Sequence, residues 1–346
     1  MSNRKIILYT PWMEQGLSYD AKAIYDIAHK NKFDIYISYR TKRKIKWDCN
    51  FISEKELTSF INNNDLLFFF EVFPKKQIEA ISKFNSNIYL MINFEYYDIS
   101  LIPFYKLFKS IFVKSKEAYN ECKKDGLNNI QYLQWILSDF KIYKENLIKN
   151  SKKIKVLFNG GTGGYLDRRN LESIISLITN YPDDDVEFVI KMSKKIRRWS
   201  KKILKKNINI LKKDYRVTII IDDYERNKYK NFIKSFDINL APSKFEGFGL
   251  TLLESMYARV PTITLNASPM NEIIINEKSG ICMPCKIIGM INKQPIYQVD
   301  KLIFLKYFTS LIKNRERINY MKENTSLHLN SMIDKFNCEI ENIINA

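Results

Sequence analysis

The chain has 346 residues, of which 45% are apolar and 14% aromatic, and it carries a formal net charge of +18. This length and apolar content are typical of a globular protein with two hydrophobic cores. No apolar run reaches the roughly 18–20 residues of a membrane-spanning helix, and the N-terminus lacks the features of a signal peptide, so we expect a cytoplasmic protein.

The first half of the chain alternates short apolar runs with amphipathic stretches. The runs predict strands at Lys5–Tyr9, Phe33–Ser38, Asp65–Glu71, Asn87–Asn93, Ser110–Lys114 and Ile130–Leu133. The stretches between them predict helices at Tyr19–Asn31, Glu54–Asn63, Lys75–Phe84 and Ser115–Lys124. Such alternation indicates a doubly wound parallel sheet with helices on both faces.

The same pattern restarts after a polar stretch at Asp139–Lys153. Further strands are predicted at Lys153–Asn159, Asp185–Lys191, Val217–Asp222, Asp237–Ala241 and Pro261–Leu265. We therefore predict an α/β protein with two Rossmann-like domains, at residues 1–145 and 146–322, which face each other across a cleft. A C-terminal helix is expected at residues 323–346.

The most informative motif is Ser243-Lys244-Phe245-Glu246-Gly247-Phe248-Gly249-Leu250-Thr251-Leu252-Leu253-Glu254. It follows a buried strand and opens a helix, and this is how an α/β protein presents a site. Gly247 and Gly249 allow the backbone to approach a ligand, and the free N–H groups of the new helix attract a phosphate. Glu246 and Glu254 can line the same pocket.

This motif resembles the nucleotide-sugar signature of the retaining glycosyltransferases of family 4, also called group 1, which have the GT-B architecture. The resemblance implies that Glu246 contacts the donor sugar and that Glu254 binds the ribose. It also implies that the backbone of Gly247, Phe248, Gly249 and Leu250 holds the sugar and the phosphates. The first domain then serves the acceptor, the second binds the donor, and the final helix crosses back to the first domain.

A second glycine-rich loop, Asn159-Gly160-Gly161-Thr162-Gly163-Gly164, joins a predicted strand to a helix. Glycines in this setting can cradle a phosphate, and we expect Gly161, Gly163 and Gly164 to bind the donor. The family usually carries an Arg and, five residues later, a Lys in this loop. Matching the following helix puts Arg169 on the Lys position and Gly164 on the Arg position, so one expected cation is missing.

Other cationic side chains near the strand ends can supply the positive charge that is missing at Gly164. Arg168 or Arg169 supplies a guanidinium, and Lys191 at the end of the next strand is our candidate for the second charge, although a surface role would also suit it. Asp222, at the carboxyl end of another strand, is expected to help seat the nucleotide base. Arg169, Lys191 and Glu246 are the predicted catalytic residues.

The first domain offers weaker signals. The loop that holds Gly16 follows the first strand, and Asn93 and Glu95 follow the strand at Asn87–Asn93. The resemblance implies that both loops face the cleft. Relatives often carry a His in the second loop, and this chain has none there.

The positions of the histidines favour a mechanism without a protein base. Retaining transfer in this family is usually explained by a front-face route, in which a leaving-group oxygen accepts the proton of the acceptor hydroxyl. The only two histidines, His29 and His328, lie away from the predicted strand ends. We expect no metal site and no cofactor, with a nucleotide sugar as substrate.

The positive net charge is compatible with several kinds of binding partner. It fits an anionic membrane surface, a phosphate-bearing glycan or lipid-linked acceptor, or simply a Lys-rich coding bias. We do not expect a nucleic-acid partner, because no DNA- or RNA-binding motif accompanies the charge. The alternatives to a UDP- or GDP-sugar transferase are a nucleotide-sugar epimerase or phosphorylase on the same fold and a basic nucleic-acid-binding protein.

Overall fold

A computed structural model describes residues 4–143 and 153–346. These residues form two compact units, one of residues 1–139 with 331–346 and one of residues 140–330. The predicted domain boundary at 145/146 lies outside the described residues. The structure places the division at Asp139 and Phe140, and the end of the chain clusters with the first unit.

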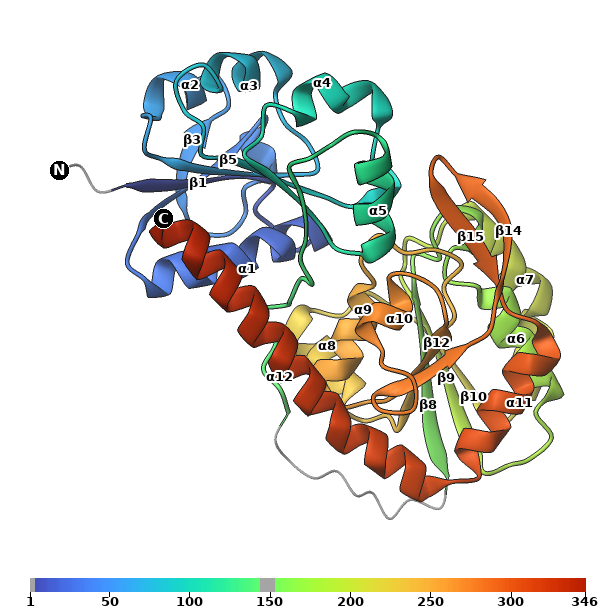
Figure 1. Cartoon of the computed structure of the whole chain (residues 1–346). Helices are drawn as coiled ribbons and strands as arrows, with labels where there is room; N and C mark the ends of the chain where they lie inside the picture. Colours follow the sequence, from blue (N-terminus) through green and yellow to red (C-terminus); the bar gives the residue numbers. More distant parts are fainter. Residues whose placement is uncertain (1–3, 144–152) are drawn as a thin grey trace. The chain divides into compact units, whose positions relative to one another are not determined.

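Unit 1 is built on a parallel sheet that, within the described residues, has seven strands in the order β3-β2-β1-β4-β5-β6-β7. Its strands are β1 (Lys5–Tyr9), β2 (Asp34–Tyr39), β3 (Asn50–Ser53), β4 (Leu66–Phe70), β5 (Ile88–Ile92), β6 (Ser110–Val113) and β7 (Ile130–Tyr132). Its helices include α1 (Gly16–Lys30), α2 (Leu57–Phe60), α3 (Lys75–Ile81), α4 (Ile102–Tyr105) and α5 (Lys116–Lys124). Figure 1 shows α1 on one side of this sheet and α2, α3 and α4 on the other.

Unit 2 has a second parallel sheet, of six strands within the described residues, in the order β10-β9-β8-β11-β12-β13. The strands are β8 (Ile154–Gly161), β9 (Val186–Met192), β10 (Val217–Ile221), β11 (Ile238–Ala241), β12 (Thr262–Leu265) and β13 (Gly280–Met283). An antiparallel hairpin, β14 (Lys286–Ile291) and β15 (Gln294–Gln298), follows β13.

The helices of unit 2 cover both faces of its sheet (Figure 1). They are α6 (Leu171–Asn180), α7 (Arg198–Lys213), α8 (Arg226–Ile233), α9 (Leu250–Tyr257), α10 (Met270–Ile273) and α11 (Lys301–Ile312). The long helix α12 (Arg315–Asn345) belongs to unit 2 up to Asn330 and to unit 1 from Ser331. The prediction of two doubly wound α/β domains is confirmed.

Buried apolar strands make the two cores. Every residue of β4 and β5 is buried, because these central strands carry helices on both faces. In unit 1, Trp135 is fully buried, and its ring packs edge-on against Phe336 of α12 at 4.9 Å between ring centroids. This contact holds the end of α12 on the core of unit 1.

One sequence prediction of local structure was wrong, and several elements were not predicted. The helix expected at Glu54–Asn63 is only α2, because Asn62 and Asp65 form a polar turn in which the Asp65 carboxylate accepts the Asn62 amide at 2.9 Å. The edge strands β3 and β13 and the β14–β15 hairpin were not predicted. All of them lie away from the central strands of the two parallel sheets.

Candidate functional site

The signature motif forms the loop between β11 and the helix α9 in unit 2. Glu246 lies in this loop with 3% of its surface exposed, and Glu254 lies on α9 with 6% exposed. Gly249 is the N-cap of α9 with φ 90° and ψ 51°, a left-handed conformation that favours glycine. Because glycine has no side chain, the N-cap residue supplies no side-chain acceptor to the first-turn N–H groups of α9.

The residues around Gly249 complete this loop. Gly247 precedes the buried Phe248, and Leu250 is the first residue of α9. The backbone oxygen of Glu246 accepts a hydrogen bond from the Gln294 side chain of β15 at 2.5 Å, so the unpredicted hairpin supports the loop.

Two arginines lie against the Glu246 carboxylate. Arg169 donates from Nη1 to Oε1 of Glu246, and the Nη2 atom of Arg168 lies 3.9 Å from Oε2. The Arg168 guanidinium also lies 5.7 Å from the centre of the Phe245 ring. The sequence predicted these three charged residues for one site, and the structure brings them together.

The Glu254 carboxylate is held by two residues that the sequence analysis missed. Arg226 donates to Oε1 of Glu254 at 2.6 Å, and the Tyr229 hydroxyl donates to Oε2 at 3.1 Å. Burial raises the pKa of Glu254, and the Arg226 and Arg169 guanidiniums oppose this shift. Arg169 therefore acts electrostatically on both signature carboxylates.

Arg226 and Tyr229 both lie on α8, which begins four residues after Asp222. The only signal in the sequence was their place just after a strand's carboxyl end, where α/β sites lie.

The glycine-rich loop after β8 has a left-handed backbone. Gly161, Gly163 and Gly164 have φ values of 51°, 81° and 78°. A Cβ at Gly164 would lie 2.8 Å from the Cβ of Arg168 and 3.4 Å from its Nε. The Arg168 side chain thus occupies the space beside Gly164, where the resemblance led us to expect an arginine.

The loop continues with left-handed residues other than glycine. Leu166, Asp167 and Asn170 have φ values of 50°, 55° and 61°, which are rare for such residues. Asp167 is buried and accepts hydrogen bonds from the Ser200 hydroxyl at 2.7 Å and the Glu172 amide at 3.2 Å. Strained backbone of this kind concentrates at functional sites.

The contact between this loop and α7 gives a stability prediction. A Cβ at Gly163 would lie 2.0 Å from the Ser200 Oγ, whereas nothing lies within 4 Å of one at Gly161. Gly161→Ala should cost about 1–2 kcal/mol for the left-handed backbone alone. Gly163→Ala should cost roughly 2–5 kcal/mol, because overpacking against Ser200 is added to the backbone cost. Amide hydrogen exchange in β8 and α7 measures the loss of stability in both variants. Equal losses would contradict the steric clash between a Cβ at position 163 and Ser200.

Lys191 and Asp222 lie close to each other at the ends of β9 and β10. The Lys191 Nζ donates to the backbone oxygen of Asp222 at 3.2 Å and lies 4.9 Å from the Tyr224 ring and 5.5 Å from the Tyr229 ring. Burial lowers the pKa of Lys191, and nearby carboxylates, Glu254 among them, oppose this. The Asp222 carboxylate is paired with Lys194 at 2.8 Å.

The three residues predicted in the first domain lie in unit 1. Gly16 is the first residue of α1, and Asn93 and Glu95 follow β5. Asn93 donates from its side chain to Glu71, whose pKa is raised by burial. Lys114 pairs with Asp20 of α1 at 2.7 Å, and both side chains are buried. The carboxyl edge of this sheet therefore carries a polar cluster of its own.

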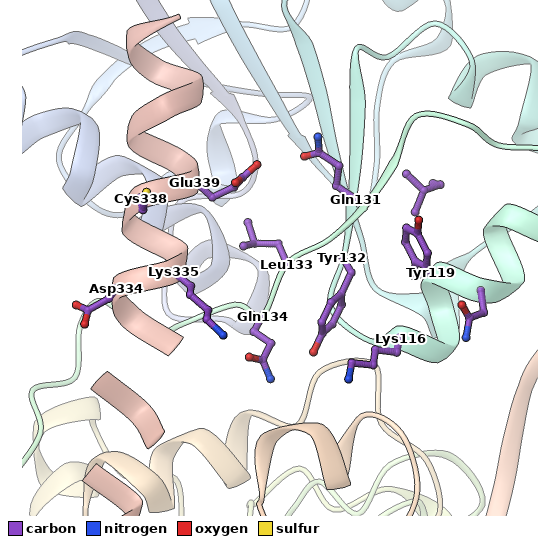
Figure 2. Close-up of a pocket in the computed structure, with 12 residues that line it drawn as sticks. Lys116, Tyr119, Gln131, Tyr132, Leu133, Gln134, Asp334, Lys335, Cys338 and Glu339 are labelled. Carbon is purple, nitrogen blue, oxygen red and sulfur yellow. The ribbon is translucent and has the colours of Figure 1, made fainter. Parts of the chain in front are cut away.

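Unit 1 also has a hollow of about 1140 Å³ (Figure 2). Tyrosines, amides and charged side chains from α5, from the segment at 130–134 and from α12 line it: Lys116, Tyr119, Asn120, Ile130, Gln131, Tyr132, Leu133, Gln134, Asp334, Lys335, Cys338 and Glu339. None of the site residues predicted from the sequence lines this hollow.

Among the described residues, no group of three or more His, Cys, Asp or Glu side chains could hold a metal ion. The Asp183-Asp184-Asp185 run precedes β9, and Lys313 pairs with Asp183 and with Asp185.

Solved structures share this architecture. A glycosyltransferase from Rickettsia africae has a TM-score of 0.74 at 11% sequence identity, over 99% of both chains. Anabaena HepE in complex with UDP and glucose has a TM-score of 0.72 at 10% identity, over 99% of both chains. WaaG, a glycosyltransferase involved in lipopolysaccharide biosynthesis, has a TM-score of 0.64 at 11% identity, over 99% of this chain and 100% of the other. The fold is therefore that of the GT-B glycosyltransferases.

The family model of the glycosyl transferases group 1 matches residues 139–326, which is more than half of the chain. The chain belongs to this family, and it is a glycosyltransferase. A comparison with curated proteins found no match.

Proposed function

We propose that this protein is a retaining glycosyltransferase that moves a sugar from a nucleotide-diphosphate sugar to an acceptor hydroxyl. The observation that carries the proposal is the pairing of both signature carboxylates with arginines in unit 2. Glu246 contacts Arg169, and Glu254 contacts Arg226. Glu246 lies three residues before Gly249, the N-cap of α9, which supplies no side-chain cap to that helix, and an uncapped helix N-terminus suits a phosphate.

Each group has a distinct role in the proposed donor complex. Glu246 binds the transferred sugar, and Glu254 binds the ribose through hydroxyls that replace part of its present hydrogen bonding. Arg169, Arg168 and the α9 amides face the diphosphate. A guanidinium that is already positioned beside a carboxylate can share its remaining N–H groups with phosphate oxygens, because it carries five donors.

Transfer would proceed on one face of the sugar. The bond from the anomeric carbon to the diphosphate oxygen breaks, the bond to the acceptor oxygen forms on the same face, and the acceptor proton passes to the departing phosphate. This route requires no protein base. The arginines stabilise the charge that develops on the diphosphate, a task that a metal performs in other enzymes, so we also propose metal-independent transfer.

The donor base is proposed as uracil. Anabaena HepE, one of the similar structures, is in complex with UDP and glucose. The acceptor is proposed to be a glycan or a lipid-linked glycan, because WaaG acts in lipopolysaccharide biosynthesis and shares this fold. The hollow in unit 1 offers tyrosine rings and amide groups of the kind that bind sugars.

The experiment is a donor panel. Because binding to the folded state raises apparent stability, a UDP-sugar should raise the melting temperature more than the matching GDP-sugar. Nucleotide release should continue in EDTA, and NMR should find the anomeric configuration of the donor retained in the product. An inverted product would refute the retaining mechanism, and failure to bind any nucleotide sugar would refute the proposal as a whole. Free sugar phosphate or an epimerised donor would instead identify a phosphorylase or an epimerase.

A further inference from the structure

Helix α7 of unit 2 carries an unusual concentration of positive charge. Seven of its 16 residues are Lys or Arg, and none is acidic. Its buried residues, Ser200, Leu204 and Leu211, lie on one face that packs on the unit. The rest of the helix faces away from this core, so most of its charge is exposed.

The exposed surface of α7 is not only basic. Trp199 is 50% exposed and Ile210 is 55% exposed, and Ile203 between them is partly exposed. Steps of four and seven residues put these three side chains on one side of the helix. They form an apolar stripe that the core of unit 2 leaves uncovered.

A lysine row runs beside this stripe. Lys202, Lys206 and Lys213 each follow a stripe residue by three positions, and residues three apart are neighbours on a helix surface. All three lysines are exposed. A half-exposed Trp with isoleucines beside a row of lysines is the pattern of a helix that lies in the interface of an anionic bilayer.

The N-terminal end of α7 is fixed to the glycine-rich loop of the site. The Ser200 hydroxyl donates to Asp167 at 2.7 Å, and the Arg197 amide donates to the Thr162 oxygen at 2.8 Å. This anchoring keeps the helix in one orientation, so the stripe and the lysine row form a preformed surface.

We propose that the stripe and lysine row of α7 bind the surface of an anionic lipid bilayer. The lysines face the lipid phosphates, and Trp199, Ile203 and Ile210 enter the headgroup region. Nucleic acid fits this surface less well, because phosphate contacts alone leave the isoleucines exposed to water. The surface does not include the proposed donor site, so its test is independent of turnover.

The full chain should sediment with vesicles of phosphatidylcholine and phosphatidylglycerol, and not with phosphatidylcholine alone, and salt should weaken this binding. A variant with Lys202, Lys206 and Lys213 changed to Gln should lose affinity on the order of 100-fold, at roughly tenfold or less per lysine near the surface. The matched control changes Lys42, Arg43 and Lys44 to Gln. These are exposed in unit 1, and their loss should cost less than about threefold through net charge alone.

Trp199 gives a direct readout of the bound face. Trp12 and Trp135 are buried and Trp47 is partly buried, so Trp199 is the most exposed of the four tryptophans. Its emission should shift to the blue with anionic vesicles and be quenched by brominated acyl chains, and Trp199→Phe should remove both signals. Equal losses in the α7 variant and the control, or unchanged Trp199 emission on bound vesicles, would overturn the proposal. Tighter binding to single-stranded RNA than to vesicles, with the same lysine dependence, would overturn it too.

Discussion

The Arg169→Ala variant is expected to turn over its nucleotide sugar about 10²–10³-fold more slowly than the wild type, with the loss in kcat. The Arg169 guanidinium contacts Glu246 and acts electrostatically on Glu254 as well. In the proposed reaction it stabilises charge that appears on the diphosphate only as the sugar departs, and such groups affect kcat more than substrate binding. Steady-state kinetics at varied donor concentrations shows how the effect divides between kcat and KM.

Two neighbouring variants serve as controls. Arg168→Ala removes a guanidinium whose Nη2 lies 3.9 Å from Glu246, so its cost should be smaller, roughly tenfold. Arg169→Lys keeps the charge without the planar fork and should recover part of the rate. Because Arg168 still faces Glu246 when Arg169 is absent, the fold should survive, and circular dichroism can check this. A rise in KM with unchanged kcat would mean that Arg169 only binds the donor.

The centre of each sheet could be predicted from the sequence because buried parallel strands are nearly continuous apolar runs. Residues 66–70, Leu-Leu-Phe-Phe-Phe, are wholly buried as β4, and the prediction of a strand there was correct within one residue at each end. The edge strand β10 was also predicted from an apolar run, whereas other edge elements were missed. β14 has the exposed residues Ile287 and Ile288, and its pairing with β15 depends on tertiary structure that the local pattern does not encode.

The site was predictable where one segment contains the whole signal. Glu246 and Glu254 share a motif, and their distance along the chain is fixed by the loop and by α9. Arg226 and Tyr229 contact Glu254 from α8, 25 or more residues earlier. An arginine in a basic chain with 56 Lys and Arg residues gives no local sign that it is paired with a buried carboxylate. Such a contact depends on how α8 and α9 pack.

The place of the Arg168 side chain also could not be predicted from the sequence. Gly164 stands at the position where the family usually carries an arginine. We therefore expected Lys191 to supply the missing positive charge. The structure shows that the Arg168 side chain lies over Gly164, four residues away, because the loop between them turns through left-handed conformations at Leu166 and Asp167. A guanidinium can thus occupy the same space from a different backbone position.

The Arg226→Ala variant is expected to lose about 3–5 kcal/mol of stability in unit 2, because it leaves the buried Glu254 carboxylate without its closest cation. Adding Glu254→Gln to Arg226→Ala should restore most of that loss, since a neutral amide needs no counter-ion. The single Glu254→Gln variant is the matched control and should cost less than Arg226→Ala. Urea unfolding followed by amide hydrogen exchange in α9 reports unit 2 separately.

The pH dependence of the free energy of unfolding of these variants tests whether the unpaired Glu254 charge causes the loss of stability. The folded-state pKa of Glu254 is raised by burial, so the folded state binds a proton more readily than the unfolded state does. This group therefore lowers the free energy of unfolding as pH rises from the ordinary glutamate value, about 4.3, through its raised folded pKa. Without Arg226 the folded-state pKa of Glu254 rises further, and the pH range over which the free energy of unfolding falls extends to higher pH. The deficit of Arg226→Ala should thus be largest at neutral pH and shrink as Glu254 is protonated, whereas the double variant should show no such dependence. A deficit of equal size at every pH would show that Arg226 stabilises α9 by packing, including its contact with the Phe140 ring at 4.5 Å, and not by its charge.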